Sequence, residues 1–478
     1  MAAPPLMLDA KTRAQLWRKL VEAIEAYATK LEIGRVTPPL DPAKLRDMLA
    51  RFDFSAPVDA HEALDFIVER LWKFQTHTRH PRYFGLFNPA PTTMGIAGDA
   101  LVAAFNPQLA AWSHSPLAIE IEQHLVRAFG ARFGYDPAET DGTFASGGME
   151  ANHTAVLTAL VQAFPEFSSR GLRALAAQPV LYVSAEAHHS LLKASRLCGL
   201  GTDAVREIPV EARLRMNPEI LASRIAQDRA QGFAPFMVAA TAGTTNAGAI
   251  DPLPTIANVA AREKLWLHVD AAWGGAAALV PELRPLLDGI ERADSITFDA
   301  HKWLSVPMGA GVYLTRHTDV LDRTFAIAQT YMPREAAELE VVNPFLHSVQ
   351  WSRRAIGLKV FLSLAVAGWE GYATAIRQMV AMGARLREQL EAAGWQVVND
   401  TPLPLCCFID QRHAQGRSAG YLHAVAMKVV SSGKAWISTT RLAGSVPVLR
   451  ACITNYRTGA DDIAALIGAL EKARRQLS

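Results

Sequence analysis

Cysteine is scarce in this sequence, with four residues in 478, and its spacing does not suggest a metal site. The four are Cys198, Cys406, Cys407 and Cys452. They form no CxxC pair of the kind that holds structural zinc, and the histidine pair at His188 has no further ligands at a matching spacing. We therefore predict no bound metal. Scattered thiols of this kind are typical of a reducing compartment.

Long apolar runs and leader-like segments are also missing. No apolar run reaches the ~20 residues that cross a bilayer. Residues 1–12 lack a basic stretch followed by an apolar core. We therefore expect a cytoplasmic protein without a membrane partner.

Neither sign of charge is in excess. The chain has 48 basic and 46 acidic residues and a net charge of +2, and it contains no basic run. Nucleic-acid-binding surfaces need clustered positive charge. We therefore exclude nucleic acid as a partner and expect a small molecule instead.

Hydrophobic residues, by contrast, make up 50% of the chain, enough for a large core and more than one domain. Near the N-terminus, residues 12–32 and 60–76 each carry apolar side chains at helical spacing. These amphipathic helices must bury one face on something outside themselves. A partner subunit is the candidate, which predicts a homodimer.

The middle of the chain alternates short apolar runs with helical segments. The runs are 180–184, 236–241, 265–270, 295–298 and 310–314. This alternation predicts an α/β fold with a parallel sheet covered on both faces. Ligands of such sheets bind beyond the carboxyl ends of the strands, where this sequence keeps its polar residues.

From about Gly371 the pattern changes to a long helix, several shorter strands and a final helix. The helix is expected at 372–393 and the strands at 395–398, 405–409, 436–439 and 449–454. This describes a smaller α+β domain. We therefore predict an N-terminal helical segment packing on the partner subunit (1–85), a large domain (86–370) and a small C-terminal domain (371–478).

Two residues at strand ends are candidates for catalysis. Lys302 stands where an apolar run ends, and burial lowers the pKa of an amine, so that it can attack an aldehyde as a Schiff-base lysine. A surface lysine with a buried stem is the other interpretation. Asp270 ends the run 265–270 and is either a helix cap or, opposite a pyridine nitrogen, the group that keeps this nitrogen protonated.

Three further residues suggest how a ligand is held. Gly147 and Gly148 precede a helix, and glycines there let backbone N–H groups approach an anion. His188 follows the run 180–184 and either stacks on a ring or makes structural hydrogen bonds. Each signal is weak alone and gains weight from the others.

Five segments, in this order, closely resemble the group II pyridoxal-phosphate-dependent decarboxylases, the family of aromatic-L-amino-acid, glutamate and histidine decarboxylases. They are Ser146-Gly147-Gly148-Met149-Glu150-Ala151, Ala187-His188, Gly243-Thr244-Thr245, His268-Val269-Asp270-Ala271-Ala272, and Asp294-Ser295 with Asp299-Ala300-His301-Lys302-Trp303. The resemblance covers nearly the whole chain. It implies the fold-type-I architecture of pyridoxal-phosphate-dependent transferases and an obligate dimer.

The resemblance also implies a role for each matching position. Lys302 would hold pyridoxal 5'-phosphate as a Schiff base, Asp270 would pair with its pyridine nitrogen, and His188 would stack on the ring. The other expected cofactor residues are Ala272 on the second ring face, Thr245 beside Asp270, Asp299 near the lysine, and Gly147, Gly148, Met149, Ser295 and His301 around the phosphate. Most relatives have serine or threonine at position 149, so the methionine predicts somewhat weaker retention of the cofactor.

A catalytic tyrosine on a mobile loop that reaches a neighbouring active site is implied as well. The segment Thr330-Tyr331-Met332-Pro333 matches this loop. Tyr331 would protonate the substrate α-carbon after loss of carbon dioxide, directly or through His188. A tyrosine of the core is the other interpretation.

The expected reaction is therefore decarboxylation of an L-amino acid to a primary amine. An aldehyde synthase or another lyase would use the same scaffold, but related aldehyde synthases tend to have phenylalanine in place of Tyr331. A catalytically silent scaffold protein is a third hypothesis, against which the intact Lys302, Asp270 and His188 argue.

Aromatic residues favour an aromatic substrate. Tyr83, Phe84 and Trp112, together with Phe87, are candidates for the substrate pocket. The same side chains also suit a core behind the pocket.

Overall fold

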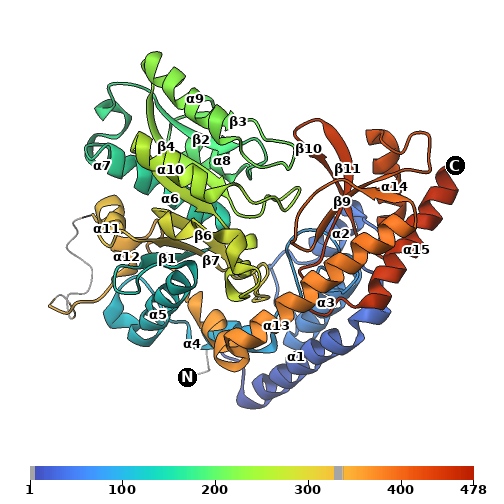
Figure 1. Cartoon of the computed structure of the whole chain (residues 1–478). Helices are drawn as coiled ribbons and strands as arrows, with labels where there is room; N and C mark the ends of the chain where they lie inside the picture. The colour runs from blue at the N-terminus through green and yellow to red at the C-terminus, as the bar shows by residue number, and fades with distance from the viewer. Residues whose placement is uncertain (1–5, 328–335, 337) are drawn as a thin grey trace.

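The computed structural model describes residues 6–327, 336 and 338–478 and contains a seven-stranded sheet (Figure 1). Its strands are β1 (Asp141–Ala145), β2 (Pro179–Ser184), β3 (Val205–Ile208), β4 (Ala234–Thr241), β5 (Trp266–Asp270), β6 (Ser295–Asp299) and β7 (Gly311–Thr315). They lie in the order β1-β7-β6-β5-β4-β2-β3. Strands β3, β2, β4, β5 and β6 are parallel to one another, whereas β7 is antiparallel to both β6 and β1. The predicted mostly parallel sheet is confirmed.

Helices cover both faces of this sheet. Among them are α5 (Pro116–Phe133), α6 (Gly148–Ala163), α8 (Ser190–Leu197), α9 (Pro218–Ala230) and α10 (Leu253–Glu263). Successive side chains of a strand point to opposite faces. Accordingly, Val180 and Tyr182 belong to one buried apolar cluster, while Leu181 and Val183 belong to another. Burial on both faces explains why these strands are continuous apolar runs.

A second, antiparallel sheet forms the smaller part of the molecule. It has the order β10-β11-β9-β8, with β8 (Trp395–Val397), β9 (Leu405–Asp410), β10 (Ser438–Leu442) and β11 (Val446–Cys452), and it carries α14 (Ala419–Ser432) and α15 (Ala460–Leu477). The strand predicted at 436–439 begins later, because Trp436 forms an isolated bridge with Tyr83 instead.

The long helix α13 (Gly357–Ala392) connects the two parts of the molecule. It contacts α4 (Thr93–Phe105) and α5 on one side and β8 and α15 on the other. Its backbone leaves the helical conformation at Gly368, where φ is +62°. The predicted boundary at 371 lies just beyond this break, inside the helix.

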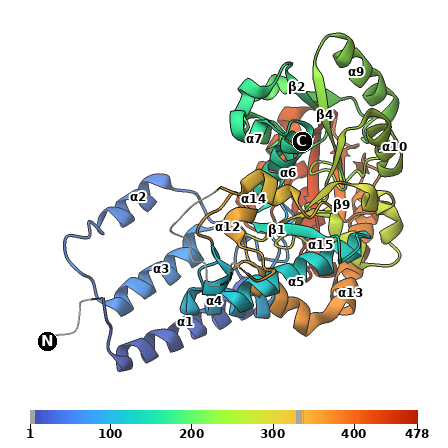
Figure 2. The same cartoon turned by 90° about the vertical axis from the view of Figure 1, so that its left-hand side faces the viewer.

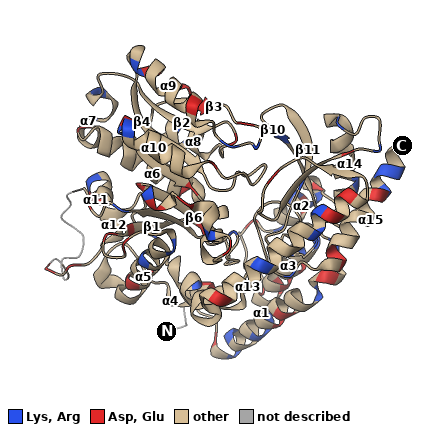
Figure 3. Ribbon diagram, viewed as in Figure 1, with Lys and Arg blue, Asp and Glu red and all other residues tan. Residues whose placement is uncertain are grey.

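Three helices of the N-terminal segment project from the rest of the chain (Figure 2). They are α1 (Ala10–Lys30), α2 (Pro42–Ala50) and α3 (Ala60–Phe74), so the helices predicted at 12–32 and 60–76 are present. Asp9 caps α1 and Asp59 caps α3, each by accepting backbone N–H bonds of the first turn. Figure 3 shows basic and acidic residues mixed along α1 and α3.

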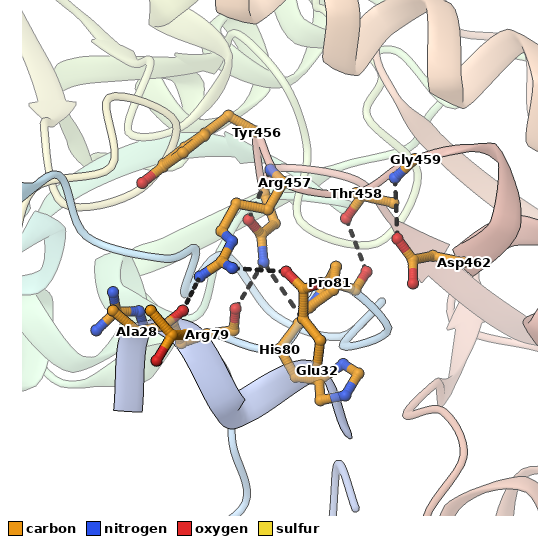
Figure 4. Close-up of polar contacts among 12 residues, drawn as sticks. Ala28, Glu32, Arg79, His80, Pro81, Tyr456, Arg457, Thr458, Gly459 and Asp462 are labelled. Carbon is orange, nitrogen blue, oxygen red and sulfur yellow. Dashed lines mark hydrogen bonds and ion pairs between the residues drawn. The ribbon is translucent and has the colours of Figure 1, made fainter. Parts of the chain in front are cut away.

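The base of these helices is attached to the C-terminal part of the same chain (Figure 4). Arg457 donates to the carbonyl of Ala28 at 3.1 Å and forms an ion pair with Glu32 at 2.6 Å. Thr458 Oγ1 donates to the carbonyl of Pro81 at 2.7 Å. The segment around residues 79–83 is therefore held against the small sheet.

No helix in the described ranges has the length and hydropathy that a bilayer span requires.

Candidate active site

A cavity of about 290 Å³ opens at the carboxyl ends of β4, β5 and β6. Its lining residues are Ser146, Gly147, Gly148, Met149, Asn152, His188, Thr241, Gly243, Thr245, Asp270, Ala272, Trp273, Asp299, His301, Lys302 and Met308. This volume is close to the lower end of the roughly 300–1,000 Å³ of small-molecule sites. The structure thus brings together every predicted cofactor residue except Ser295.

Ser295 lies at the opposite end of β6 from Asp299 and is fully buried. Its Oγ accepts a hydrogen bond from Trp266 Nε1 at 2.8 Å and contacts His268 Nδ1 at 2.9 Å. At about 3.3 Å per residue, Ser295 lies about 13 Å along the strand from Asp299, the end of β6 that lines the cavity. The predicted contact of Ser295 with a phosphate is therefore wrong.

Lys302 follows β6, and its ammonium has a carboxylate partner. Lys302 Nζ lies 3.1 Å from Asp299 Oδ2 and 5.7 Å from the centroid of the Phe87 ring. Asp299 is 1% exposed, and its Oδ1 has no hydrogen-bond partner within the described part of the chain. The pair compensates the charge of the lysine and leaves one buried carboxylate oxygen free at the cavity.

Asp270, at the end of β5, presents a fixed carboxylate. Its Oδ1 accepts from the backbone N–H of Ala272 at 3.1 Å, and its Oδ2 accepts from Asn152 Nδ2 at 2.8 Å. The residue is 5% exposed. Its orientation is thus set from two elements, the turn after β5 and helix α6.

Glycines at the start of α6 and in β7 allow close packing beside the cavity. A Cβ atom on Gly148 would lie 2.8 Å from Asp299 Oδ2. On Gly311 of β7 a Cβ atom would lie 2.6 Å from the carbonyl carbon of Gly147. Side chains at these positions would therefore collide with Asp299 and with the backbone of Gly147. The free N–H groups of the first turn and the helix dipole favour a phosphate there.

His188 enters the cavity from the segment after β2 as a neutral imidazole. Burial lowers its pKa, and the negative charge of Asp270 opposes this effect. Its Nδ1 accepts from the backbone N–H of Ser190 at 3.2 Å. The proton of the neutral ring is therefore on Nε2.

Several lining residues were not found from the sequence. Trp273 is one of them, and it packs against Phe87 and Trp303, which are not among the lining residues, with ring centroids 4.6 and 5.5 Å away. Asn152 sits one turn into α6, on the side that faces Asp270. Its position four residues after Gly148 is the available signal, because residues at this spacing share a helix face.

The three predicted substrate residues do not line this cavity. Tyr83 packs against Trp436 at 5.0 Å, and Phe84 is fully buried in the core. Trp112 Nε1 donates to Glu120 at 2.9 Å. The packing of these side chains therefore agrees with the second interpretation, a core behind the pocket.

Tyr331 lies outside the described residues. The helices on either side of its segment, α11 (Val320–Phe325) and α12 (Pro344–His347), are joined by His347. This imidazole lies 2.7 Å from both Asp322 and Asp141. Burial alone would lower the pKa of His347. The two carboxylates outweigh this effect and raise the pKa to about 9.

Fold and site together define a class of enzyme. A lysine amine, a carboxylate, an imidazole and a helix N-terminus meet at one end of an α/β sheet. These groups fit an aldehyde, a pyridine nitrogen, an aromatic ring and a phosphate, which are the parts of pyridoxal 5'-phosphate. The residues present therefore fit this cofactor.

Comparisons with known proteins agree with this class. Residues 46–410 match the family model of the pyridoxal-dependent decarboxylase conserved domain, and the chain belongs to this family. An aromatic-L-amino-acid decarboxylase of Bacillus atrophaeus is 31% identical over 99% of this chain and 98% of its own length. Cysteine sulfinic acid decarboxylase of Rattus norvegicus is 34% identical over 73% of this chain and 71% of its own length.

A solved structure also agrees in fold over the full length. The crystal structure of Oryza sativa TDC with PLP and tryptamine has a TM-score of 0.91 and 26% identity and covers 100% of each chain. The predicted fold type I, the cofactor and the reaction type are thereby confirmed: the chain is a pyridoxal-phosphate-dependent amino-acid decarboxylase.

Proposed function

We propose that this enzyme converts an aromatic L-amino acid to its primary amine, with Lys302, Asp270, His188 and Tyr331 as catalytic residues. The observation that carries the proposal is the convergence of Lys302, Asp270 and the N-terminus of α6 on one cavity. When bound, pyridoxal phosphate accepts the electron pair that remains on the substrate α-carbon as carbon dioxide leaves.

Each cavity residue then has a task in binding or proton transfer. Lys302 Nζ would attach the cofactor covalently, and Asp270 would keep a proton on the ring nitrogen. The N–H groups of Gly148 and Met149 would bind the phosphate at the start of α6. His188 would contact the ring, and its Nε2–H would be available to the substrate.

Arg450 is the residue best placed to bind a carboxylate of the substrate. Its Nε donates to the carbonyl of Thr245 and its Nη1 to the carbonyl of Gly85, each at 2.9 Å. Its Nη2 is buried without a partner among the described residues. The guanidinium lies 5.1 Å from the Phe87 ring, which also contacts Lys302. A free, buried N–H of this kind gains most from a charged acceptor.

Two substrate classes follow from these observations. Trp273, which lines the cavity and packs against Phe87, supports an aromatic side chain, as does the name of the full-length Bacillus relative. The free Nη2 of Arg450 and the name of the Rattus relative favour an acidic side chain as the second candidate.

A panel of amino acids with measured release of carbon dioxide separates the two. We expect kcat/KM for an aromatic amino acid to exceed that for cysteine sulfinic acid by about 100-fold, because the site would leave a second charge unpaired. Arg450→Met should raise KM for every substrate if Arg450 binds the α-carboxylate. A preference for the acidic amino acid, abolished in Arg450→Met, would instead assign Arg450 to the side chain and contradict the aromatic proposal.

The functional unit, we propose, is a homodimer built on the N-terminal helices. Trp17 and Val21 of α1 are 62% and 59% exposed, and Leu71 of α3 is 51% exposed. Nearby, Phe105 at the end of α4 is 80% exposed. Apolar surface this extensive is unusual for a monomer and is typical of an interface. A second copy of the chain would cover it.

Sedimentation equilibrium at micromolar concentration should therefore give twice the chain mass of 51.9 kDa. The double variant Trp17→Glu/Val21→Glu should move the mass towards the monomer, because two charges would be buried without partners. Leu197→Glu, at a residue of α8 that is 60% exposed, is the matched control and should stay dimeric. An active monomer of the native chain would contradict the proposal.

A further inference from the structure

We propose that Asn152 and His268 are positioning residues that keep the shared proton on the cofactor nitrogen and off Asp270. They act through a buried hydrogen-bond relay formed by Trp266, Ser295, His268, Asn152 and Asp270. The inference rests on the proposed pairing of Asp270 with the ring nitrogen. It assigns a function to side chains that do not themselves react.

The relay is continuous from one end of β5 to the other. Trp266 Nε1 donates to Ser295 Oγ at 2.8 Å, and Ser295 Oγ lies 2.9 Å from His268 Nδ1. His268 Nε2 lies 3.0 Å from Asn152 Oδ1. Asn152 Nδ2 then donates to Asp270 Oδ2 at 2.8 Å. None of the five residues is more than 6% exposed, so water does not compete for these bonds.

The direction of the relay follows from its two ends, Trp266 and Asp270. The indole N–H of Trp266 can donate but not accept, so the oxygen of Ser295 is the acceptor. The hydroxyl hydrogen of Ser295 is then available to His268 Nδ1. Burial lowers the pKa of His268 to about 4, so the ring is neutral and carries one proton. A charged carboxylate can only accept, so Asn152 gives its NH₂ group to Asp270 and turns its Oδ1 to His268. The ring proton of His268 is therefore on Nε2, and Nδ1 accepts from Ser295.

The proton on His268 Nε2 in turn orients the amide of Asn152. Nε2–H donates to Oδ1, which turns the NH₂ group of Asn152 towards Asp270 Oδ2 and Ser190 Oγ, at 2.8 and 2.7 Å. A flipped amide would place two donors against each other at His268 and two acceptors against each other at Asp270. Thr297 Oγ1 is farther from Nε2, at 3.4 Å, and does not replace Asn152.

The relay acts on the protonation of the Asp270 carboxylate. Asp270 receives one N–H on each oxygen, from Asn152 and from the backbone of Ala272. Hydrogen bonds donated to a carboxylate favour its charged form. A proton shared between this carboxylate and a pyridine nitrogen therefore stays on the nitrogen. Loss of the Asn152 donor should shift the proton towards Asp270 and weaken the ring as an electron sink.

The experiment uses the holoenzyme loaded with pyridoxal phosphate that is ¹⁵N-labelled at the ring nitrogen. The ¹⁵N chemical shift reports the protonation of this nitrogen, and equilibrium dialysis gives the dissociation constant of the cofactor. Asn152→Leu and His268→Phe remove the relay, whereas His268→Gln keeps one donor and one acceptor on the side chain. Thr297→Val removes a neighbouring hydroxyl and is the matched control.

In the native protein the shift should be that of a protonated pyridine. Asn152→Leu and His268→Phe should move it towards the unprotonated value and weaken cofactor binding about tenfold, the effect of one hydrogen bond to a charged group. His268→Gln and Thr297→Val should remain close to native. If the two disruptive variants fail to fold, Ser295→Ala, which removes one hydroxyl, should move the shift in the same direction.

Failure of the relay can be distinguished from failure of the proposed function through Asp270→Asn. If Asp270→Asn changes the ¹⁵N shift but neither disruptive relay variant nor Ser295→Ala does, the relay is wrong and the pairing of Asp270 stands. If Asp270→Asn leaves both the shift and the dissociation constant unchanged, the pairing itself is wrong, and the inference falls with it.

Discussion

Lys302→Ala should lower the rate of amine formation by about 10⁴-fold or more, the upper end of the range for loss of an acid–base group. Lys302 Nζ is the amine that reaches the cavity between Asp299 and the Phe87 ring. Its removal takes away both the covalent attachment of the cofactor and a group that can exchange protons with the substrate. Release of carbon dioxide measures the loss.

Borohydride reduction followed by peptide mass spectrometry tests the same assignment directly. The native enzyme should carry the pyridoxyl group on Lys302, and Lys302→Ala should carry none. Lys359 provides a stringent comparison, because it is a buried lysine whose Nζ lies 3.3 Å from the carbonyl of Met308 at the cavity. Labelling of Lys359 in the native enzyme would show that the assignment is wrong.

Tyr331→Phe is the change that should alter the product as well as the rate. We propose that the Tyr331 hydroxyl protonates the substrate α-carbon, and a general acid contributes about 10²- to 10⁴-fold to such a step. The variant keeps the ring and loses the proton, so the amine should fall by that factor. Cofactor binding should be unchanged, because it does not use the hydroxyl.

The unprotonated α-carbon should then become open to oxygen. Two electrons pass to O₂ to give hydrogen peroxide, and hydrolysis releases an aldehyde and ammonia. Amine and aldehyde yields for native enzyme and Tyr331→Phe, with and without oxygen, measure this partition. Tyr456→Phe, at a half-buried tyrosine outside the proposed site, is the control.

Two outcomes would change the assignment. An unchanged amine rate in Tyr331→Phe would show that the proton comes from another group, of which His188 Nε2 is the nearest candidate. Aldehyde as the main product of the native enzyme would place this chain among the aldehyde synthases of the same scaffold.

The strands of the large sheet that the sequence predicted are those that read as runs of mainly apolar residues. Strands β2 and β4 read as apolar runs because helices cover both sides of the sheet. Strand β1 contains Asp141 and Thr143, and the edge strand β3 contains Arg206 and Glu207, so neither is a continuous apolar run. Pairing with β7 and β2 makes them strands, and pairing partners are distant in sequence.

The sequence by itself determined the order of the chemical groups along the chain and the end of the sheet where they meet. Asp270 and Lys302 follow parallel strands, and parallel strands bring their carboxyl ends to one edge, so strand assignment sufficed to place them. Only the tertiary structure decided which other side chains contact the groups at that edge. Ser295 belongs to a local sequence motif, yet its side chain contacts His268. Asn152 reaches Asp270 from helix α6. Packing across the sheet sets the strand register that places Ser295 and the helix rotation that places Asn152.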